Sequence, residues 1–324
     1  MAGPAMIEGG GLGRFAAEDI GPSPVQEANG VIDIIAENEN QAIALAKRYL
    51  SYFQGDESAW QYANESKLST SLPLDRLRVY DMRLLIERLI DDDSGLELRS
   101  KFAPNIITML ARIEGKAIGL IANNPSTLGG AIDANAADKA SRFVQLCNAH
   151  GLPIISLIDT PGNMVGPQAE AQALVRHCCR LFVAGAKVTV PWVSVVVRKA
   201  YGLGAMAMAA GSFHDSLLSV AWPQAEFGGM GLEGAVRLGF KRELESLSSD
   251  QEREQLFTTK FDEMMEQGKA ISAAMLFEID AVIDPDATRA WILSALEVAG
   301  AHTKGHANRS MASNRLSPRF IDTW

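Results

Sequence analysis

The chain contains little cysteine: only Cys147, Cys178 and Cys179 occur among its 324 residues. Three thiols cannot form the disulfide framework that stabilises small secreted proteins. Two of them are adjacent within a predicted helix, and no neighbouring motif supports a thiol nucleophile. We therefore expect core or interface thiols in a reducing compartment, the cytoplasm.

Long apolar runs, a leader segment and an excess of basic charge are also missing. No stretch approaches about 18 uninterrupted apolar residues, and the first residues do not join a charged to an apolar segment, so no membrane partner is expected. Lys and Arg number 30 against 39 Asp and Glu, which argues against nucleic acid or an anionic membrane as partner. No metal-ligand spacing occurs, and neither His177 nor His214 belongs to a triad pattern, so no bound metal is expected.

What the sequence does contain is a series of apolar strands that alternate with helices. Glu114-Gly-Lys separates two β-like runs, 106–113 and 117–122, which is typical of a hairpin. Further strands are predicted at 153–158, 192–197 and 216–221, and helices at 75–90, 134–150, 168–185, 204–211 and most of 231–299. This order implies an α/β fold with a mainly parallel sheet covered by helices.

The most informative stretch covers residues 193–211. A β-branched strand passes through a short basic turn into Gly202-Leu-Gly204 and then into a helix of small residues. This order leaves uncapped N–H groups at a helix N-terminus, which can bind a phosphate or stabilise a negative oxygen. Gly202-x-Gly204-x-x-Ala207 fits a dinucleotide fingerprint, but Arg198-Lys-Ala-Tyr201 separates it from the strand and no acidic strand end follows about 20 residues later. An oxyanion site is favoured, with a nucleotide site and a structural turn as alternatives.

Several blocks of the chain, in order and spacing, resemble one family. They are Gly3–Gly11, Leu50–Gln54, Gly129–Asp133 with Ala137–Lys139, Asp159–Gly162, Arg198–Gly202, Ala221–Pro223, Glu226–Val236 and Ile321–Trp324. Together they are similar to the carboxyltransferase (beta) subunit of biotin-dependent acyl-CoA carboxylases of the acetyl- and propionyl-CoA type. Several blocks in the right order are more specific than any one of them.

The resemblance implies a crotonase-like, ClpP-like superhelix of ββα repeats, which periodicity alone could not separate from a doubly wound sheet. A subunit of that family holds two such domains, and this sequence resembles the C-terminal portion. Residues 1–56 are then expected to be a remnant of the N-terminal domain, with a strand at Val31–Ile35 and a helix at Glu39–Phe53. Residues 57–74 would be a linker and 75–301 the C-terminal carboxyltransferase domain. Residues 302–324 would be an extended tail, whose end docks on a neighbouring subunit or frays.

The resemblance also assigns roles to residues of the glycine turn. The backbone N–H groups of Leu203 and Gly204 become oxyanion donors on the biotin side, with biotin contacts at Gly162, Gly166, Tyr201 and Gly202. Better-known members carry Gly-Ala at 203 and 204, so the Leu203 side chain is expected to point away from the pocket. Gly204 is expected there for its φ freedom. Met206 stands where short-chain carboxylases can carry an acidic residue, and it predicts a longer or branched acyl group, no selection of acyl length, or simply helix packing.

Secondary candidates are Gly129, Gly130, Asp159, Gly228 and Gly229. Gly129 and Gly130 would present N–H donors or form a tight turn before a helix capped by Asp133. Asp159 is expected to cap the segment after its strand rather than take a direct role.

The resemblance implies transfer of a carboxyl group from carboxybiotin, carried on a partner protein, to an acyl-CoA. Expected partners are a biotin carboxylase and biotin carrier subunit, and an N-terminal carboxyltransferase half that supplies the thioester side, in a homo- or hetero-oligomer. Helix 168–185 offers an apolar stripe for association, or for packing on its own sheet. Alternatives are a biotin-dependent acyl-CoA decarboxylase component and a non-catalytic assembly subunit or truncated remnant.

Overall fold

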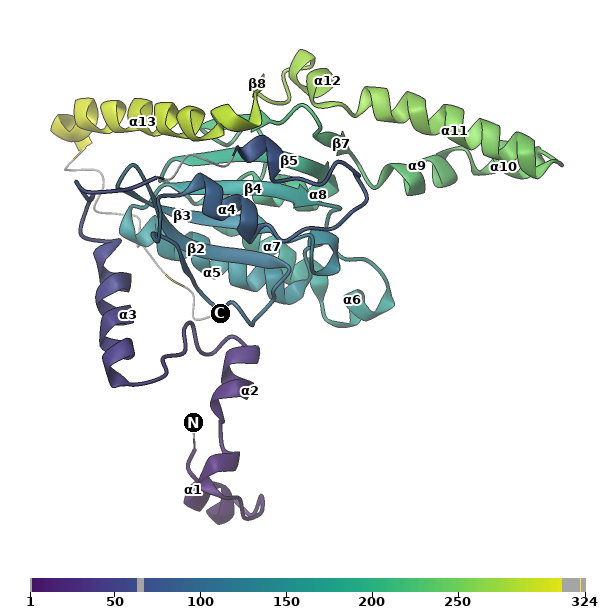
Figure 1. The fold of residues 1–324 in the computed structure, drawn as a ribbon. Helices are drawn as coiled ribbons and strands as arrows, with labels where there is room; N and C mark the ends of the chain where they lie inside the picture. Colours follow the sequence, from purple (N-terminus) through teal and green to yellow (C-terminus); the bar gives the residue numbers. More distant parts are fainter. Residues whose placement is uncertain (1, 63–66, 311–320, 322–324) are drawn as a thin grey trace.

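The computed structural model describes residues 2–62, 67–310 and 321, arranged as Figure 1 shows. Within these residues eight strands form one sheet in the order β1-β2-β3-β4-β5-β6-β8, and β7 also pairs with β5. The strands are β1 Leu96–Glu97, β2 Ile106–Ile113, β3 Lys116–Asn123, β4 Ile154–Thr160, β5 Trp192–Tyr201, β6 Leu218–Ala221, β7 Glu226–Gly228 and β8 Ala281–Val282. The pairs β1–β2 and β2–β3 are antiparallel and the later pairs are parallel, which confirms the opening hairpin and the mainly parallel sheet.

The turn of the β2–β3 hairpin follows from two residues. Glu114 and Gly115 both have positive φ, 51° and 72°. A two-residue turn of this hand matches the twist of the strands that it joins. Asp91 stabilises the turn, because its carboxylate accepts hydrogen bonds from the backbone N–H groups of Glu114 and Gly115 at 2.9 and 2.7 Å.

The sheet separates two apolar cores, because successive residues of a strand point to opposite faces. Ile154 and Ile158 of β4 face the core that α5 (Ala134–His150), α7 (Leu174–Ala186) and α8 (Gly202–Met208) cover. Ile155 and Leu157 face the second core, which α4 (Arg83–Leu89) and α13 (Thr288–Ser310) cover. Figure 1 shows α5 and α7 on one side of the sheet and α13 on the other.

Two groups of helices extend away from this body (Figure 1). The N-terminal group comprises α1 (Pro4–Gly9), α2 (Ser23–Ala28) and α3 (Glu39–Ser51). The second group, which we call the helical arm, comprises α9 (Leu232–Gly239), α10 (Lys241–Ser246) and α11 (Asp250–Gln267) and is followed by α12 (Ala270–Met275). Short 3-10 turns occur at Ala17–Asp19, Leu68–Thr70, Leu128–Gly130 and Pro285–Ala287.

Two predicted elements in the first part of the chain are wrong. Residues 31–35 form no strand. The Asp33 carbonyl instead accepts a hydrogen bond from the Arg99 backbone N–H, and the Asp33 carboxylate accepts one from the Arg99 guanidinium. The helix predicted at 75–90 is limited to α4, Arg83–Leu89. The carbonyls of Arg76 and Arg78 accept hydrogen bonds from the Arg198 guanidinium, so loop 75–82 satisfies them without a helix.

Two later predictions also need correction. The helix predicted at 168–185 is two helices, α6 (Pro167–Ala171) and α7, because Ala173 has φ 56° between them. Leu174, Cys178 and Leu181 of the predicted stripe are buried, whereas Val175 is exposed, and α7 packs on α5. Residues 302–310 continue α13 and are therefore helical rather than extended. Ile321 packs against the first core, and the rest of the predicted tail, 311–320 and 322–324, lies outside the described residues.

Other expectations are confirmed in whole or in part. The helix at 134–150 is confirmed, with Asp133 as its N-cap, and the helix expected at Glu39–Phe53 is α3. Cys147 and Cys178 are buried as expected, but Cys179 is exposed. In the described part of the chain, no helix has both the length and the apolar character that a bilayer span requires. Part of the predicted linker 57–74, residues 63–66, lies outside the described residues.

Candidate functional site

The candidate site is the turn at which β5 ends and α8 begins. Tyr201 is the N-cap residue of α8 and its side chain makes no cap hydrogen bond. Gly202 follows with φ 57°, a backbone conformation that favours glycine. The first N–H groups of a helix have no intrahelical acceptor and lie at its positive end. The N–H groups of Leu203 and Gly204 are therefore available to a negatively polarised oxygen.

Three glycines that the sequence singled out meet at this turn. A side chain at Gly204 would place its Cβ 2.6 Å from the carbonyl carbon of Gly162, a contact that backbone atoms could not tolerate. Gly162 has φ 112°, and its own Cβ would lie 3.1 Å from the Tyr201 carbonyl oxygen. A Cβ at Gly202 would lie 2.9 Å from the Gly229 carbonyl oxygen. Gly204 has no positive φ, so close backbone approach, not the expected φ freedom, is what requires glycine there.

The other predicted glycines divide into two groups. Gly130 belongs to the same region, since its Cβ would lie 2.4 Å from the carbonyl oxygen of Asp159. Gly228 and Gly229 lie beside the turn, through β7 and its pairing with β5. Gly129 has φ 62° with open space around its Cα, and Gly166, φ 110°, has only Gln168 within 4 Å of a built Cβ. These two residues have the conformation of turn glycines and do not contact the turn.

Asp159 is the centre of a buried ionic cluster at the carboxyl end of β4. Its Oδ2 accepts from Arg198 Nε at 3.0 Å and from the Tyr80 hydroxyl at 2.8 Å, and its Oδ1 accepts from the Lys199 backbone N–H at 3.2 Å. Burial raises the pKa of Asp159, while Arg198 and Lys199 oppose that shift. Asp159 therefore joins β4 to β5 just before the turn, and the expectation that it caps the following segment is wrong.

Tyr201 is held on the other side of β5. Its side chain is buried, and its hydroxyl donates to Glu226 Oε2 at 2.5 Å. Burial, and then the Glu226 carboxylate, raises the pKa of Tyr201, so the phenol keeps its proton and stays a donor. Arg76 pairs with the same carboxylate through Nε at 2.9 Å and through a second guanidinium nitrogen at 3.1 Å. The interior position of the Tyr201 ring leaves its backbone as the part that faces the turn.

Leu203 and Met206 line an apolar cavity of about 460 Å³ beside the turn. Phe213 and Phe227 contribute aromatic walls, and Leu276 closes one side from the end of α12. Leu203 is 62% exposed and lines this cavity. The expectation that its side chain points away from the biotin pocket stays a prediction. The cavity can take an apolar group next to the N–H groups of the turn.

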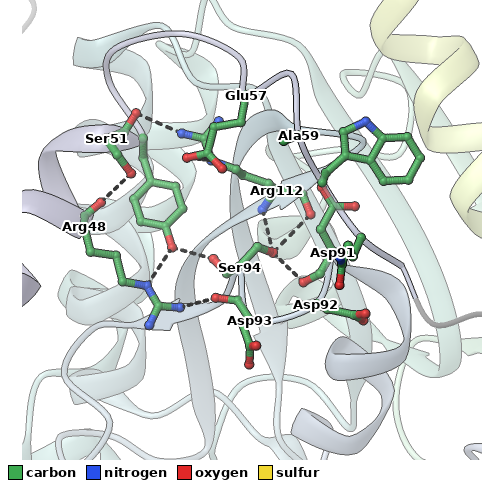
Figure 2. A pocket seen from close by; sticks show the side chains of 12 residues that line it. Arg48, Ser51, Glu57, Ala59, Asp91, Asp92, Asp93, Ser94 and Arg112 are labelled. Carbon is green, nitrogen blue, oxygen red and sulfur yellow. Dashed lines mark hydrogen bonds and ion pairs between the residues drawn. The ribbon is translucent and has the colours of Figure 1, made fainter.

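A separate polar cavity of about 400 Å³ lies between α3 and the hairpin turn (Figure 2). Arg112 donates to the carbonyls of Ser51 and Gly55 at 2.9 and 3.1 Å, and Arg48 donates to those of Asp93 and Gly95. These contacts tie the N-terminal segment to the sheet. The two arginines of this cavity are thus held by backbone carbonyls, and the cavity is not our candidate site.

Several residues of the site and its surroundings escaped sequence analysis. Arg76 and Tyr80 lie in a stretch that was predicted to be helical, and Glu226 gave no signal beyond the block to which it belongs. His177 pairs with Asp138 at 2.8 Å across α7 and α5, where Arg180 also binds Asp138 at 2.6 Å. Among the described residues, no group of three or more His, Cys, Asp or Glu could hold a metal ion.

Comparison with known proteins gives the class of this fold and site. Residues 15–311 match the model of the carboxyl transferase domain family. The chain therefore belongs to this family, and its fold is the crotonase-like fold of carboxyltransferase domains.

Individual relatives place the chain more narrowly. An uncharacterized carboxylase of Bacillus subtilis is 36% identical over 85% of this chain and 55% of its own length. The methylmalonyl-CoA carboxyltransferase 12S subunit of Propionibacterium freudenreichii is 32% identical over 92% of this chain and 58% of its own length. The structure of a single-chain, multi-domain long-chain acyl-CoA carboxylase superposes with a TM-score of 0.84 at 52% identity, over 91% of this chain and 29% of the other. The chain thus spans somewhat more than half the length of the curated relatives that it matches.

Proposed function

We propose that this chain takes part in the transfer of a carboxyl group between carboxybiotin and an acyl-CoA, and that it forms the biotin side of that site. The observation that carries this proposal is the uncapped turn between β5 and α8, packed against Gly162 so closely that Gly204 can have no side chain. Membership of the carboxyl transferase domain family supports the reaction class.

The turn would act as an oxyanion site. Carboxybiotin, carried on a partner protein, supplies the activated carboxyl group. The N–H groups of Leu203 and Gly204 would donate to the ureido oxygen, and each donor can be worth about 3 kcal/mol in a dry site. Gly162 and Gly202 would shape the turn, the backbone of Tyr201 leads into it, and Gly166 would shape the biotin channel further away. Gly130, Asp159, Gly228 and Gly229 would support this geometry, whereas Gly129 would serve only as a turn glycine.

The apolar cavity beside the turn favours a long or branched acyl group. Met206 carries a flexible side chain without charge and shares the cavity with two aromatic residues, Phe213 and Phe227. An acidic residue would have restricted such a cavity to short chains. The likeness to a long-chain acyl-CoA carboxylase structure agrees with this assignment.

The partners we propose are a biotin carboxylase and biotin carrier subunit, together with a second crotonase-like domain that binds the thioester. The described residues contain one sheet, and α1–α3 contain no buried residues, so these residues do not form a second such domain. The crystal structure of a transcarboxylase 12S, 32% identical to this chain with a TM-score of 0.83, is described as a hexamer assembly, which agrees with an oligomeric enzyme. We propose that the enzyme to which this chain belongs acts in the cytoplasm.

Carboxyl transfer in the presence and absence of an N-terminal carboxyltransferase half tests this function. We expect the 324-residue chain alone to show no carboxylation of acetyl-, propionyl- or long-chain acyl-CoA, and the complemented enzyme to prefer the longer chains. Turnover by the chain alone would contradict the half-site proposal. No transfer with a supplied half would instead favour a non-catalytic subunit.

The reverse direction is a second candidate. The alpha subunit of the methylmalonyl-CoA decarboxylase of Veillonella parvula is 30% identical over 95% of this chain. The same oxyanion donors serve either direction, since the two directions share one transition state. Incubation of the complemented enzyme with a carboxylated acyl-CoA and free biotin carrier measures this direction, as loss of the carboxyl group from the acyl-CoA and its appearance on biotin.

A further inference from the structure

Arg76 joins three parts of the molecule that are distant in sequence. Its guanidinium makes a two-point contact with Glu226 of β7 and a third hydrogen bond, 2.8 Å, to Glu233 of α9. The same group lies over the Phe261 ring of α11, 5.4 Å from its centroid. Arg76 thus connects the body to two helices of the arm, α9 through Glu233 and α11 through Phe261.

Glu226 carries this contact on to the turn. Its Oε2 accepts both from Arg76 and from the Tyr201 hydroxyl, and its side chain is only 9% exposed. Tyr201 directly precedes Gly202 and is the N-cap residue of α8. The hydrogen bond from the Tyr201 hydroxyl to Glu226 therefore holds the side chain of the residue that leads into the turn.

The backbone carbonyl of Arg76 contacts the buried ionic cluster around Asp159. Its carbonyl accepts from Arg198 at 3.1 Å, and Arg198 is the partner of Asp159. Arg76 therefore contacts both ionic groups at the end of β5. Its side chain binds Glu226, and its carbonyl binds Arg198 of the Asp159 cluster. Loop 75–82, which contains Arg76, therefore lies beside both Glu226 and Arg198.

We propose that Arg76 is a positioning residue, which couples the helical arm to the oxyanion turn through Glu226 and Tyr201. The coupling gives the arm an influence on the site, so that a change in its position alters the aim of the Leu203 and Gly204 N–H groups. This coupling depends on the proposed function only in that the proposed function gives the turn its catalytic role.

Amide hydrogen exchange on the complete chain tests the coupling, with peptides that report residues 202–209 and 250–267. Arg76→Met should speed exchange in both segments by about 10-fold or more. Tyr201→Phe, which removes one hydroxyl, should speed it only in 202–209. Phe261→Leu should speed it only in 250–267.

Arg83→Met is the matched control. Arg83 makes the same kind of two-point contact with Glu97, at 2.7 Å for each bond, and its side chain is 27% exposed against 31% for Arg76. It contacts neither the turn nor the arm, so Arg83→Met should leave both segments unchanged. In the complemented enzyme, Arg76→Met and Tyr201→Phe should lower kcat about 10-fold and leave the KM for acyl-CoA unchanged.

Two results would overturn the inference. If Arg76→Met loosens the arm and leaves 202–209 as in the wild type, Arg76 is only a structural contact. If Arg83→Met loosens all segments equally, the effect is global destabilisation. Because the exchange experiment needs no substrate, wild-type chain that fails in carboxyl transfer but shows the exchange pattern refutes the proposed function and keeps the coupling.

Discussion

At the scale of single residues, the glycines of the turn meet two different demands. Gly202 has φ 57°, a backbone conformation that is costly for most side chains, whereas Gly204 has ordinary dihedral angles and no room for a Cβ. The second demand depends on Gly162, which lies 42 positions earlier in the chain, so only folding brings it about. Both residues hold the same pair of N–H groups in place.

Gly204→Ala should therefore reduce turnover of the complemented enzyme by about 100-fold, the loss associated with one misplaced oxyanion donor. The added Cβ would meet the Gly162 backbone at 2.6 Å, and the turn must move away. Steady-state carboxyl transfer measures the effect, and circular dichroism checks the fold. Gly239→Ala in α9 is the control, because no atom lies within 4 Å of its built Cβ. Near-normal turnover of Gly204→Ala would return the turn to a structural role.

At the scale of elements, helix α5 is fastened to the start of β2 by one buried lysine. Lys139 Nζ donates to the carbonyls of Phe102, Ala103 and Ile106 at 2.8, 3.3 and 2.7 Å. Burial lowers the pKa of Lys139 to about 7. The ammonium therefore loses its proton in the folded protein at a pH where the unfolded chain still binds it.

This difference makes stability depend on pH in a defined direction. Between about pH 7 and the ordinary lysine value of 10.5, the unfolded state binds more protons, so the free energy of unfolding should rise with pH from this group. Lys139→Met should abolish that rise and, by leaving three carbonyls without a donor, destabilise the protein by about 2–4 kcal/mol. Urea denaturation at pH 6, 7.5 and 9 measures both effects. A wild-type curve that is flat across these values would contradict the assignment.

At the scale of the whole molecule, the N-terminal segment that extends from the body exposes several large apolar side chains. Helices α1, α2 and α3 contain no buried residues, and α10 and α11 of the arm contain none either. Exposed large apolar residues of the N-terminal segment are Met6, Leu12, Phe15, Val25, Val31, Ile35, Ile43 and Leu50. Such surfaces are unusual for a monomer and typical of an interface.

We therefore expect the chain to self-associate, or to be poorly soluble until a partner covers these surfaces. Sedimentation velocity at micromolar concentration should show species larger than the 34.9 kDa monomer. Met6→Ser with Phe15→Ser should shift the distribution towards monomer, while Val183→Ser on α7, an exposed apolar residue away from these helices, should not. A clean monomer that an added N-terminal half leaves unchanged would contradict this expectation.

Local patterns were enough to predict much of the fold. Apolar runs predicted β2 to β6, and Glu114-Gly-Lys between β2 and β3 predicted the hairpin, because these signals depend on neighbours in the chain. The same reasoning failed at residues 31–35, since a strand needs a neighbouring strand for its backbone hydrogen bonds and this segment pairs with none in the described structure; its Asp33 carbonyl accepts instead from the Arg99 N–H. It failed at 75–82 because Arg198, more than a hundred residues away, takes two of the carbonyls.

The sequence by itself determined the class of fold, the place of the turn and the glycines around it, since strand, turn and helix signals lie within a few residues of one another. Only the tertiary structure decided which side chains hold that turn. Arg76 binds Glu226 and Glu233 over separations of 150 and 157 residues, and Asp159 binds Arg198 over 39. From the sequence alone, a charged residue is expected to be solvated at the surface. Only folding removes that water and brings a partner within hydrogen-bond distance. The support of the site therefore remained hidden until the contacts between distant segments were known.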